Sequence, residues 1–341
     1  MEKSMVVERQ SAKTPTRRTS KGLITMAISL VVLLAFSWTL APSSVSGGAV
    51  SGMLQFGAIL AIVGLGQMLV VQQGGVDLSI PGAVSLAIVI SSHEAAGDNS
   101  KLLPAILLAF AYALGAGILN GLMVGRLGLN PIIATLGMNA LLFGAVLGIS
   151  GGTPRTTVDL LRSIGGGETL GVPNSLYFAI AALIIVSVLT KRTVAGRRFE
   201  AVGANSFAGK AMGLRVRTHQ GMAYVWAQLL YCTAGILLAG ITAQPTAYMG
   251  NAYLLPSVAV VVLGGTSLLG GRGFPVATVV AAIFLGQLDQ FVLALGVPFA
   301  VRTLVQAAAL AVGVAIYTVD WAKVRARFTA RADATASVAP H

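Results

Sequence analysis

Long apolar segments recur along this 341-residue chain and restrict its fold more than any other feature. A helix needs about 20 apolar residues to cross a membrane, whereas strands of a membrane barrel alternate apolar and polar residues over about ten positions. The chain shows continuous runs, at residues 22–41, 50–72, 78–92, 102–124, 131–149, 173–190, 219–241, 252–269, 274–296 and 298–318. The third run is short and contains Pro81, which is typical of a broken or tilted helix. The sequence therefore predicts an all-α polytopic membrane protein with about ten transmembrane helices.

The composition excludes several other classes of protein. Hydrophobic residues make up 55% of the chain and charged residues only 10%, whereas soluble domains carry about 25% charged residues. A soluble enzyme and a disordered chain are therefore excluded. The one cysteine, Cys232, lies inside an apolar run, so the chain cannot form an internal disulfide.

The positive charges predict the orientation of the helices. If the amino terminus is inside the cell, nineteen of the 23 lysines and arginines lie on the cytoplasmic side. The positive-inside rule then puts both termini in the cytoplasm. We expect a basic tail at 1–21, a permease domain at 22–320 and a second tail at 321–341. The net charge of +12 is spread over cytoplasmic segments without interleaved aromatic residues, so we expect no nucleic-acid partner.

The longest basic loop, residues 190–218, carries the signature of a short helix. Asn205 is a favourable N-cap and Gly213 a favourable stop. Between and just beyond them, Phe207, Ala208, Ala211 and Leu214 fall on one apolar face. So short a helix is marginal alone in water and must pack against something. Two interpretations stay open: a helix anchored on anionic membrane lipid, or a knob that inserts into a partner protein.

Four stretches in consistent order resemble one permease family, the ribose/xylose/arabinose-type membrane subunits of ATP-binding-cassette sugar importers. The first is the loop itself, Gly-Arg-Arg-Phe-Glu-Ala-Val-Gly-Ala-Asn at 196–205, continuing to Ala208, Ala211 and Gly213. The others are Gly-Gly-Val-Asp-Leu-Ser at 74–79, Asn120-Gly121 with Asn130-Pro131 and 135–137, and 243–247 leading into Val-Leu-Gly-Gly-Thr-Ser-Leu-Leu-Gly-Gly at 262–271. Together they span about residues 65 to 275.

This resemblance implies a function and a set of partners. Two such subunits, identical or related, would form a pathway for a monosaccharide across the inner membrane of a bacterial cell. A cytoplasmic ATPase would bind ATP and magnesium, so the chain itself needs no cofactor, and an extracytoplasmic sugar-binding protein would deliver the sugar. The ATPase would dock on the coupling segment, for which the resemblance implies these residues: Glu200, Asn205, Phe207, Ala208, Ala211, Gly213 and Leu214.

The glycine-rich stretches are interpreted as structural. Gly264, Gly265, Gly270 and Gly271 nearly imitate a phosphate-binding loop, but that loop needs Lys and then Ser or Thr after its last glycine, where this chain has Gly271 and Arg272. We expect a tight turn there instead. In the stretch Gly74, Gly75, Asp77 and Ser79, the aspartate is expected to cap or latch the next helix rather than relay protons.

Polar residues within the apolar runs are candidates for the transport pathway. They are Gln67, Asn120, Asn139, Gln244, Asp289 and Gln290. Amides can line a pathway or bond helices together, and Asp289 can either contact sugar or pair with Arg302. A deep carboxylate also leaves an alternative function, an ion-coupled secondary transporter of a small polar solute. No catalytic constellation or metal-ligand spacing is visible, so we expect neither an enzyme nor a metal site.

Overall fold

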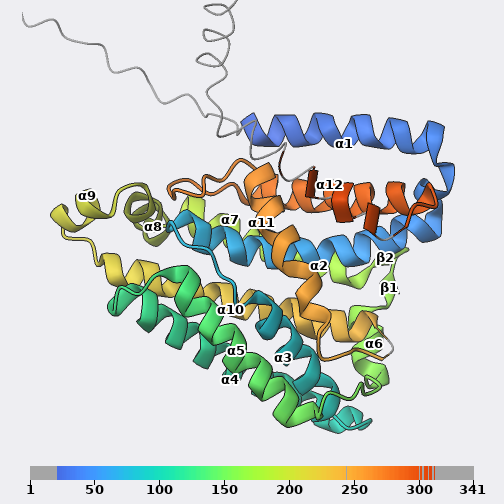
Figure 1. Ribbon diagram of the computed structural model, residues 1–341, viewed down its shortest axis with the longest axis horizontal. Coiled ribbons are helices and arrows are strands. Elements are labelled where there is room, and N and C mark those ends of the chain that lie inside the picture. The colour runs from blue at the N-terminus through green and yellow to red at the C-terminus, as the bar shows by residue number, and fades with distance from the viewer. Residues whose placement is uncertain are drawn as a thin grey trace, which may run out of the picture.

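The computed structural model describes residues 21–242, 244–298, 300–301, 303–305, 307–308 and 311. These residues fold almost entirely into helices (Figure 1). The α-helices are α1 Lys21–Leu40, α2 Gly47–Gln72, α3 Ile80–His93, α4 Leu102–Gly121, α5 Pro131–Ser150, α6 Asp159–Gly165, α7 Asn174–Arg192, α8 Val194–Ala204, α9 Ser206–Ala211, α10 Val216–Ile241, α11 Leu254–Leu263 and α12 Pro275–Ala294. The short turns are η1 Pro42–Val45, η2 Asn99–Lys101, the π-helical η3 Leu122–Arg126 and η4 Met249–Tyr253. Two short strands, β1 Glu168–Thr169 and β2 Val172–Pro173, pair as an antiparallel hairpin.

The described helices confirm an all-α membrane protein. Seven of them are long and apolar enough to cross a membrane, and they coincide with seven of the ten predicted runs. Two further apolar helices, Ile80–His93 and Met249–Leu263, are shorter. The predicted run at 298–318 lies largely outside the described residues, and the tail at 321–341 lies wholly outside them. The predicted tail at 1–21 also lies outside them, except for its last residue.

The predicted run at 252–269 is wrong at 264–269, which lie beyond the end of the helix. Helix α11 ends at Leu263, and residues 264–274 form an irregular connection to α12. The break follows from Gly265, whose φ of +88° lies in the left-handed region that ends a helix. An apolar run alone did not reveal this break, because Leu268 and Leu269 are apolar residues of a turn rather than of a helix.

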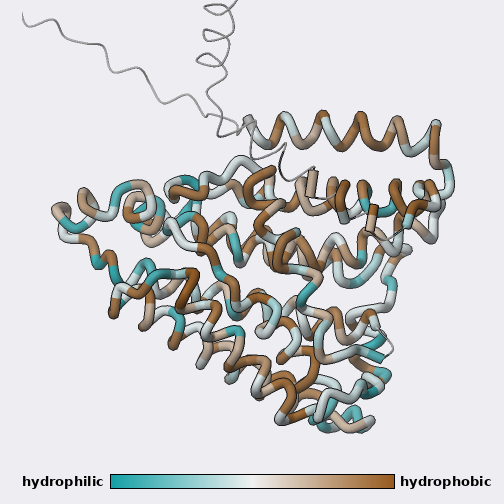
Figure 2. The backbone as a smooth tube through the Cα atoms, in the orientation of Figure 1, coloured by the Kyte–Doolittle hydropathy of each residue, from teal (hydrophilic) through white to brown (hydrophobic). Residues whose placement is uncertain are grey.

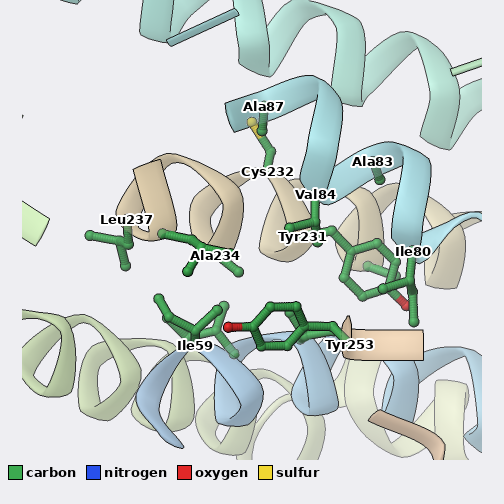
Figure 3. Close-up of a cluster of buried hydrophobic side chains, with 14 of the residues drawn as sticks. Ile59, Ile80, Ala83, Val84, Ala87, Tyr231, Cys232, Ala234, Leu237 and Tyr253 are labelled. Carbon is green, nitrogen blue, oxygen red and sulfur yellow. The ribbon is translucent and has the colours of Figure 1, made fainter. Parts of the chain in front are cut away.

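The centre of the molecule consists of α2, α3 and α10 (Figure 3). Figure 3 shows Val84 and Ala87 of α3 beside Tyr231 and Cys232 of α10, with Ile59 of α2 opposite. Gly235 permits this approach, because a side chain there would collide with α3. By contrast, α1, α4, α5 and α7 leave most of their apolar side chains exposed. The exposed apolar surface is the one that a bilayer would cover.

The two ends of the molecule differ in charge. One end carries α8, α9, the connection at 264–274 and the start of α1, and we call it the basic end (Figure 1). Ten of the thirteen lysines and arginines in the described residues lie at the basic end. The opposite end carries α6 and the β1–β2 hairpin. Figure 2 shows hydrophilic residues gathered at both ends and hydrophobic ones along the helices between them.

Candidate functional site

Helix α9 is capped at both ends as the sequence predicts. The Asn205 side-chain oxygen accepts a hydrogen bond from the Ala208 amide at 2.9 Å. At the other end, Gly213 has a φ of +77°, and the next amide, that of Leu214, bonds back to the Gly209 carbonyl at 3.0 Å. These local bonds let a helix of six residues persist at the basic end.

Helix α9 exposes an apolar surface. Phe207 is 87% exposed and Met212, just after the helix, is 66% exposed. Ala208 and Ala211 lie exposed between them, and we call these four residues the α9 surface. Leu214 does not belong to it, contrary to the predicted face, because α9 ends at Ala211 and Leu214 lies half-buried beyond Gly213. Met212 was missed although it lies four residues after Ala208, a spacing that puts both on one helix face.

Helix α8 connects α9 to the body of the protein. Its Glu200 forms two ion pairs of 3.2 Å, one with Lys191 at the end of α7 and one with Arg272 in the connection at 264–274. The Gln73 side chain donates a hydrogen bond to the Phe199 carbonyl at 2.8 Å. Helix α8 is therefore joined to three places: the end of α7, the residue after α2 and the connection that leads into α12.

The glycine stretches meet beside α8. The Gly271 amide donates a hydrogen bond to the Gln72 carbonyl at 3.0 Å, which joins the connection at 264–274 to the end of α2. Gly270 and Gly271 have φ values of +89° and +106°, which glycine adopts without strain. Gly74 lies in the linker from α2 to α3, and Gly264 and Gly265 lie at the start of the connection from α11 to α12. Gly75 packs under the Tyr224 hydroxyl. The predicted tight turn is present.

A second constellation is a buried polar network between α2, α3, α4 and α10. Asp77 lies in the linker from α2 to α3 and accepts hydrogen bonds from the Ser79 amide, the Ser79 hydroxyl and the Gln228 side chain. The Ser79 oxygen also accepts from Gln228 at 2.7 Å and from Asn120 at 3.1 Å. Gln67 completes the network. These contacts are those of a latch that fixes the linker to α2, α4 and α10.

Two of the predicted pathway residues therefore lie in this network. Gln67 accepts hydrogen bonds from the Tyr231 hydroxyl at 3.1 Å and from the Asp77 amide at 3.3 Å. Gln67 and Asn120 have no exposed surface, so in the described structure they face protein and not an open passage. Their geometry is that of interhelical hydrogen bonds.

The other pathway candidates lie apart from the network and from one another. The Asn139 side chain accepts a hydrogen bond from the Gly82 amide at 2.8 Å and so joins α5 to α3. Gln244 is exposed after the end of α10, and Asp289 and Gln290 are half-buried on α12. Arg302 lies outside the described residues, and so does the predicted pairing of Asp289 with it.

Sequence reasoning missed Tyr224 and Tyr231 as members of the buried site. They lie on α10 at positions four before and three after Gln228, so all three share one helix face. That spacing is a readable signal. Their partners are not, because Gln228 bonds to Asp77 across 151 residues of sequence.

A cavity of about 400 Å³ lies between α7, α8 and α10. Leu189, Phe199, Met222 and Trp226 contribute to its lining, which is almost wholly apolar. The lining also includes Thr190, Thr193, Thr218, Thr233 and His219. None of the predicted pathway residues lines this cavity.

Comparisons with known proteins agree with a polytopic membrane permease. The family model for the branched-chain amino acid transport system / permease component matches residues 49–314. A probable ABC transporter permease protein of Sinorhizobium fredii, y4mJ, is 31% identical over 86% of this chain and 90% of its own length. The ribose import permease protein RbsC of Escherichia coli is 32% identical over 85% of this chain and 91% of its own.

A third relative is named for a different sugar. The fructose import permease protein FruF of Bifidobacterium longum is 29% identical over 77% of this chain and 75% of its own. No solved structure matches the chain at a significant level. The family match and the two higher identities show that this chain belongs to the branched-chain amino acid transport system / permease component family, as a membrane permease of the ABC type.

Proposed function

We propose that this chain is the transmembrane subunit of an ATP-driven importer of a monosaccharide such as ribose or another pentose or hexose. In this proposal two permease subunits form the pathway, as a homodimer or with a related chain. A separate cytoplasmic ATPase binds ATP and magnesium. An extracytoplasmic binding protein delivers the sugar, and the permease itself hydrolyses nothing.

One observation carries the coupling part of the proposal: the capped helix α9 leaves Phe207 exposed in the most basic loop of the chain. An exposed phenylalanine on a rigid helix is suited to insertion into a groove of a partner. Helix α8 then connects α9 to the ends of α2 and α7 and to the segment before α12, through contacts of Glu200 and Phe199. The ATPase is the partner whose movement the permease has to receive.

The sugar part is supported by the relatives, which are named ribose and fructose import permeases. They do not support the alternative of an ion-coupled secondary transporter. We place the basic end in the cytoplasm of a bacterial cell, in its inner membrane, because lysine and arginine concentrate on the cytoplasmic side of membrane proteins. The start of α1 lies at the same end, where Gly22 packs on the backbone of Gly264 and Gly265.

Affinity purification of the intact chain in a mild detergent tests the proposal. We expect an ABC ATPase to co-purify in stoichiometric amount, and a sugar-binding protein to join when its sugar is added. A tagged, unrelated polytopic protein from the same membranes provides the control. Purification of the folded permease without any ATPase, from cells that import the sugar through it, would contradict the proposal.

A further inference from the structure

A second exposed apolar side chain lies at the basic end. Leu269 is 93% exposed at the tip of the turn formed by residues 267–271, between α11 and α12. A single exposed leucine needs no special explanation by itself. This one differs because the turn that presents it is held by specific contacts and adjoins α8, the helix that leads into α9.

The turn at 267–271 is held by specific contacts. The Leu269 amide donates a hydrogen bond to the Ser267 hydroxyl at 3.2 Å, and the Gly271 amide donates to the Gln72 carbonyl at 3.0 Å. Arg272, the next residue, pairs with Glu200 of α8 at 3.2 Å. The left-handed conformations of Gly270 and Gly271 set the direction of the turn. The backbone thus presents Leu269 in one fixed place.

The turn at 267–271 adjoins the end of α8, from which α9 begins. Gly270 packs on the backbone of Gly203, and Gly271 packs against Ala204, the last residue of α8. Helix α9 begins two residues later, at Ser206. Figure 1 shows the connection from α11 to α12 reaching α8 at the basic end. The turn that presents Leu269 therefore adjoins the end of α8 from which α9, with Phe207, begins.

The charge of the two segments that present Phe207 and Leu269 indicates the chemistry of their partner. Residues 190–218 and 264–274 hold eight lysines and arginines but one acidic residue, Glu200. That carboxylate is already held in two ion pairs. A partner that fits these two segments has apolar recesses bordered by acidic side chains, because acidic side chains complement the lysines and arginines around Phe207 and Leu269.

A lipid bilayer fits the turn less well than a protein does. Residues 264–271 have irregular backbone, and lipid-exposed irregular backbone does not occur within the hydrocarbon region. The turn also adjoins the end of α8, at the end of the molecule where α9 lies (Figure 1). A protein recess can cover Leu269 and leave the polar backbone of the turn at its edge.

We propose that the turn at 267–271 is a second docking element for the ATPase, with Leu269 entering a recess separate from the one that takes Phe207. This inference rests on the proposed function. The two contacts have different routes into the membrane domain. Phe207 acts through α8, whereas Leu269 acts on the segment that runs directly into α12 at Pro275. A single movement of the ATPase would then displace α8 and α12 together.

Labelling of introduced cysteines tests the second contact. The native Cys232 is fully buried, so the unsubstituted chain provides a low background. Leu269→Cys and Phe207→Cys are labelled with a membrane-impermeant maleimide in inside-out vesicles, with and without the ATPase subunit. Leu170→Cys, at the equally exposed tip of the β1–β2 hairpin on the opposite end, is the matched control. It is labelled in right-side-out cells.

We expect the labelling rate of Leu269→Cys and of Phe207→Cys to fall about tenfold or more when the ATPase is bound, and that of Leu170→Cys to stay unchanged. Protection of Phe207→Cys alone would overturn the second contact and leave the proposed function standing. Protection of neither position would count against both. Failure of Leu269→Cys to react even without the ATPase would place the turn in lipid, and would also overturn the inference.

Discussion

Replacing Phe207 by aspartate is expected to abolish ATPase retention and sugar uptake while leaving the permease folded. Phe207 is 87% exposed, so its replacement removes almost no contact within the chain. Burial of a phenylalanine contributes about 1.5–3 kcal/mol, and a charge driven into the same groove costs more. The ATPase affinity should therefore fall by roughly a hundredfold or more. The measurements are the ATPase-to-permease ratio after purification and the initial rate of uptake.

Two control variants make this result specific. Phe207→Leu keeps an apolar side chain and should retain most of the ATPase. Lys210→Ala removes an exposed charge from the same helix without removing apolar surface, and should cost little. Normal ATPase retention and normal uptake in Phe207→Asp would mean that α9 lies on the membrane surface and carries no coupling.

Replacing Asp77 by leucine is expected to cause a large loss of stability. The Asp77 carboxylate is fully buried and accepts hydrogen bonds from Ser79 and Gln228. Leucine leaves the Ser79 amide and hydroxyl buried without this acceptor, while Gln228 keeps its bond to the Ser79 oxygen. Each buried donor without an acceptor costs about 1–3 kcal/mol. The folded yield after detergent extraction and the midpoint of thermal unfolding should both fall sharply.

Asp77→Asn is the matched variant for this site. Its side-chain oxygen can still accept the bond from the Ser79 amide, so we expect a yield between those of the native chain and of Asp77→Leu. A different outcome separates a latch from a pathway residue. If Asp77→Leu folds and unfolds as the native chain does but transports poorly, Asp77 acts in transport and not as a latch.

Features that depend on neighbouring residues could be predicted from the sequence. The boundaries of α5 and α10 agree with the apolar runs within a few residues, because a membrane helix needs a continuous apolar stretch. The cap at Asn205 and the stop at Gly213 depend on bonds within three to five residues. For the same reason, the tight turn at Gly270 and Gly271 could be expected.

Features that depend on distant residues could not be predicted. The spacing of residues on α10 does not show that Gln228 meets Asp77, nor that Gln67 meets Tyr231. The amides at Gln67 and Asn120 look like pathway residues in sequence because both uses require the same side chain. The exposure of Leu269 was equally hidden, because the glycines predict a turn but not whether a leucine within it packs against distant residues or faces outward.

Glu200 illustrates the difference between type and role. The family resemblance assigns it to the coupling segment, and the structure places it between Lys191 and Arg272. Its contacts hold α8 to the end of α7 and to the turn that presents Leu269. We therefore expect Glu200 to position the docking surface rather than to touch the ATPase.

Uptake by reconstituted liposomes measures whether this permease moves sugar by coupling to an ATPase. The permease, its ATPase and its binding protein are placed in liposomes with ATP enclosed, and labelled ribose is supplied outside. We expect accumulation that requires hydrolysable ATP and is unchanged by ionophores that collapse proton and sodium gradients. Accumulation that follows an imposed ion gradient in the absence of ATP would contradict it.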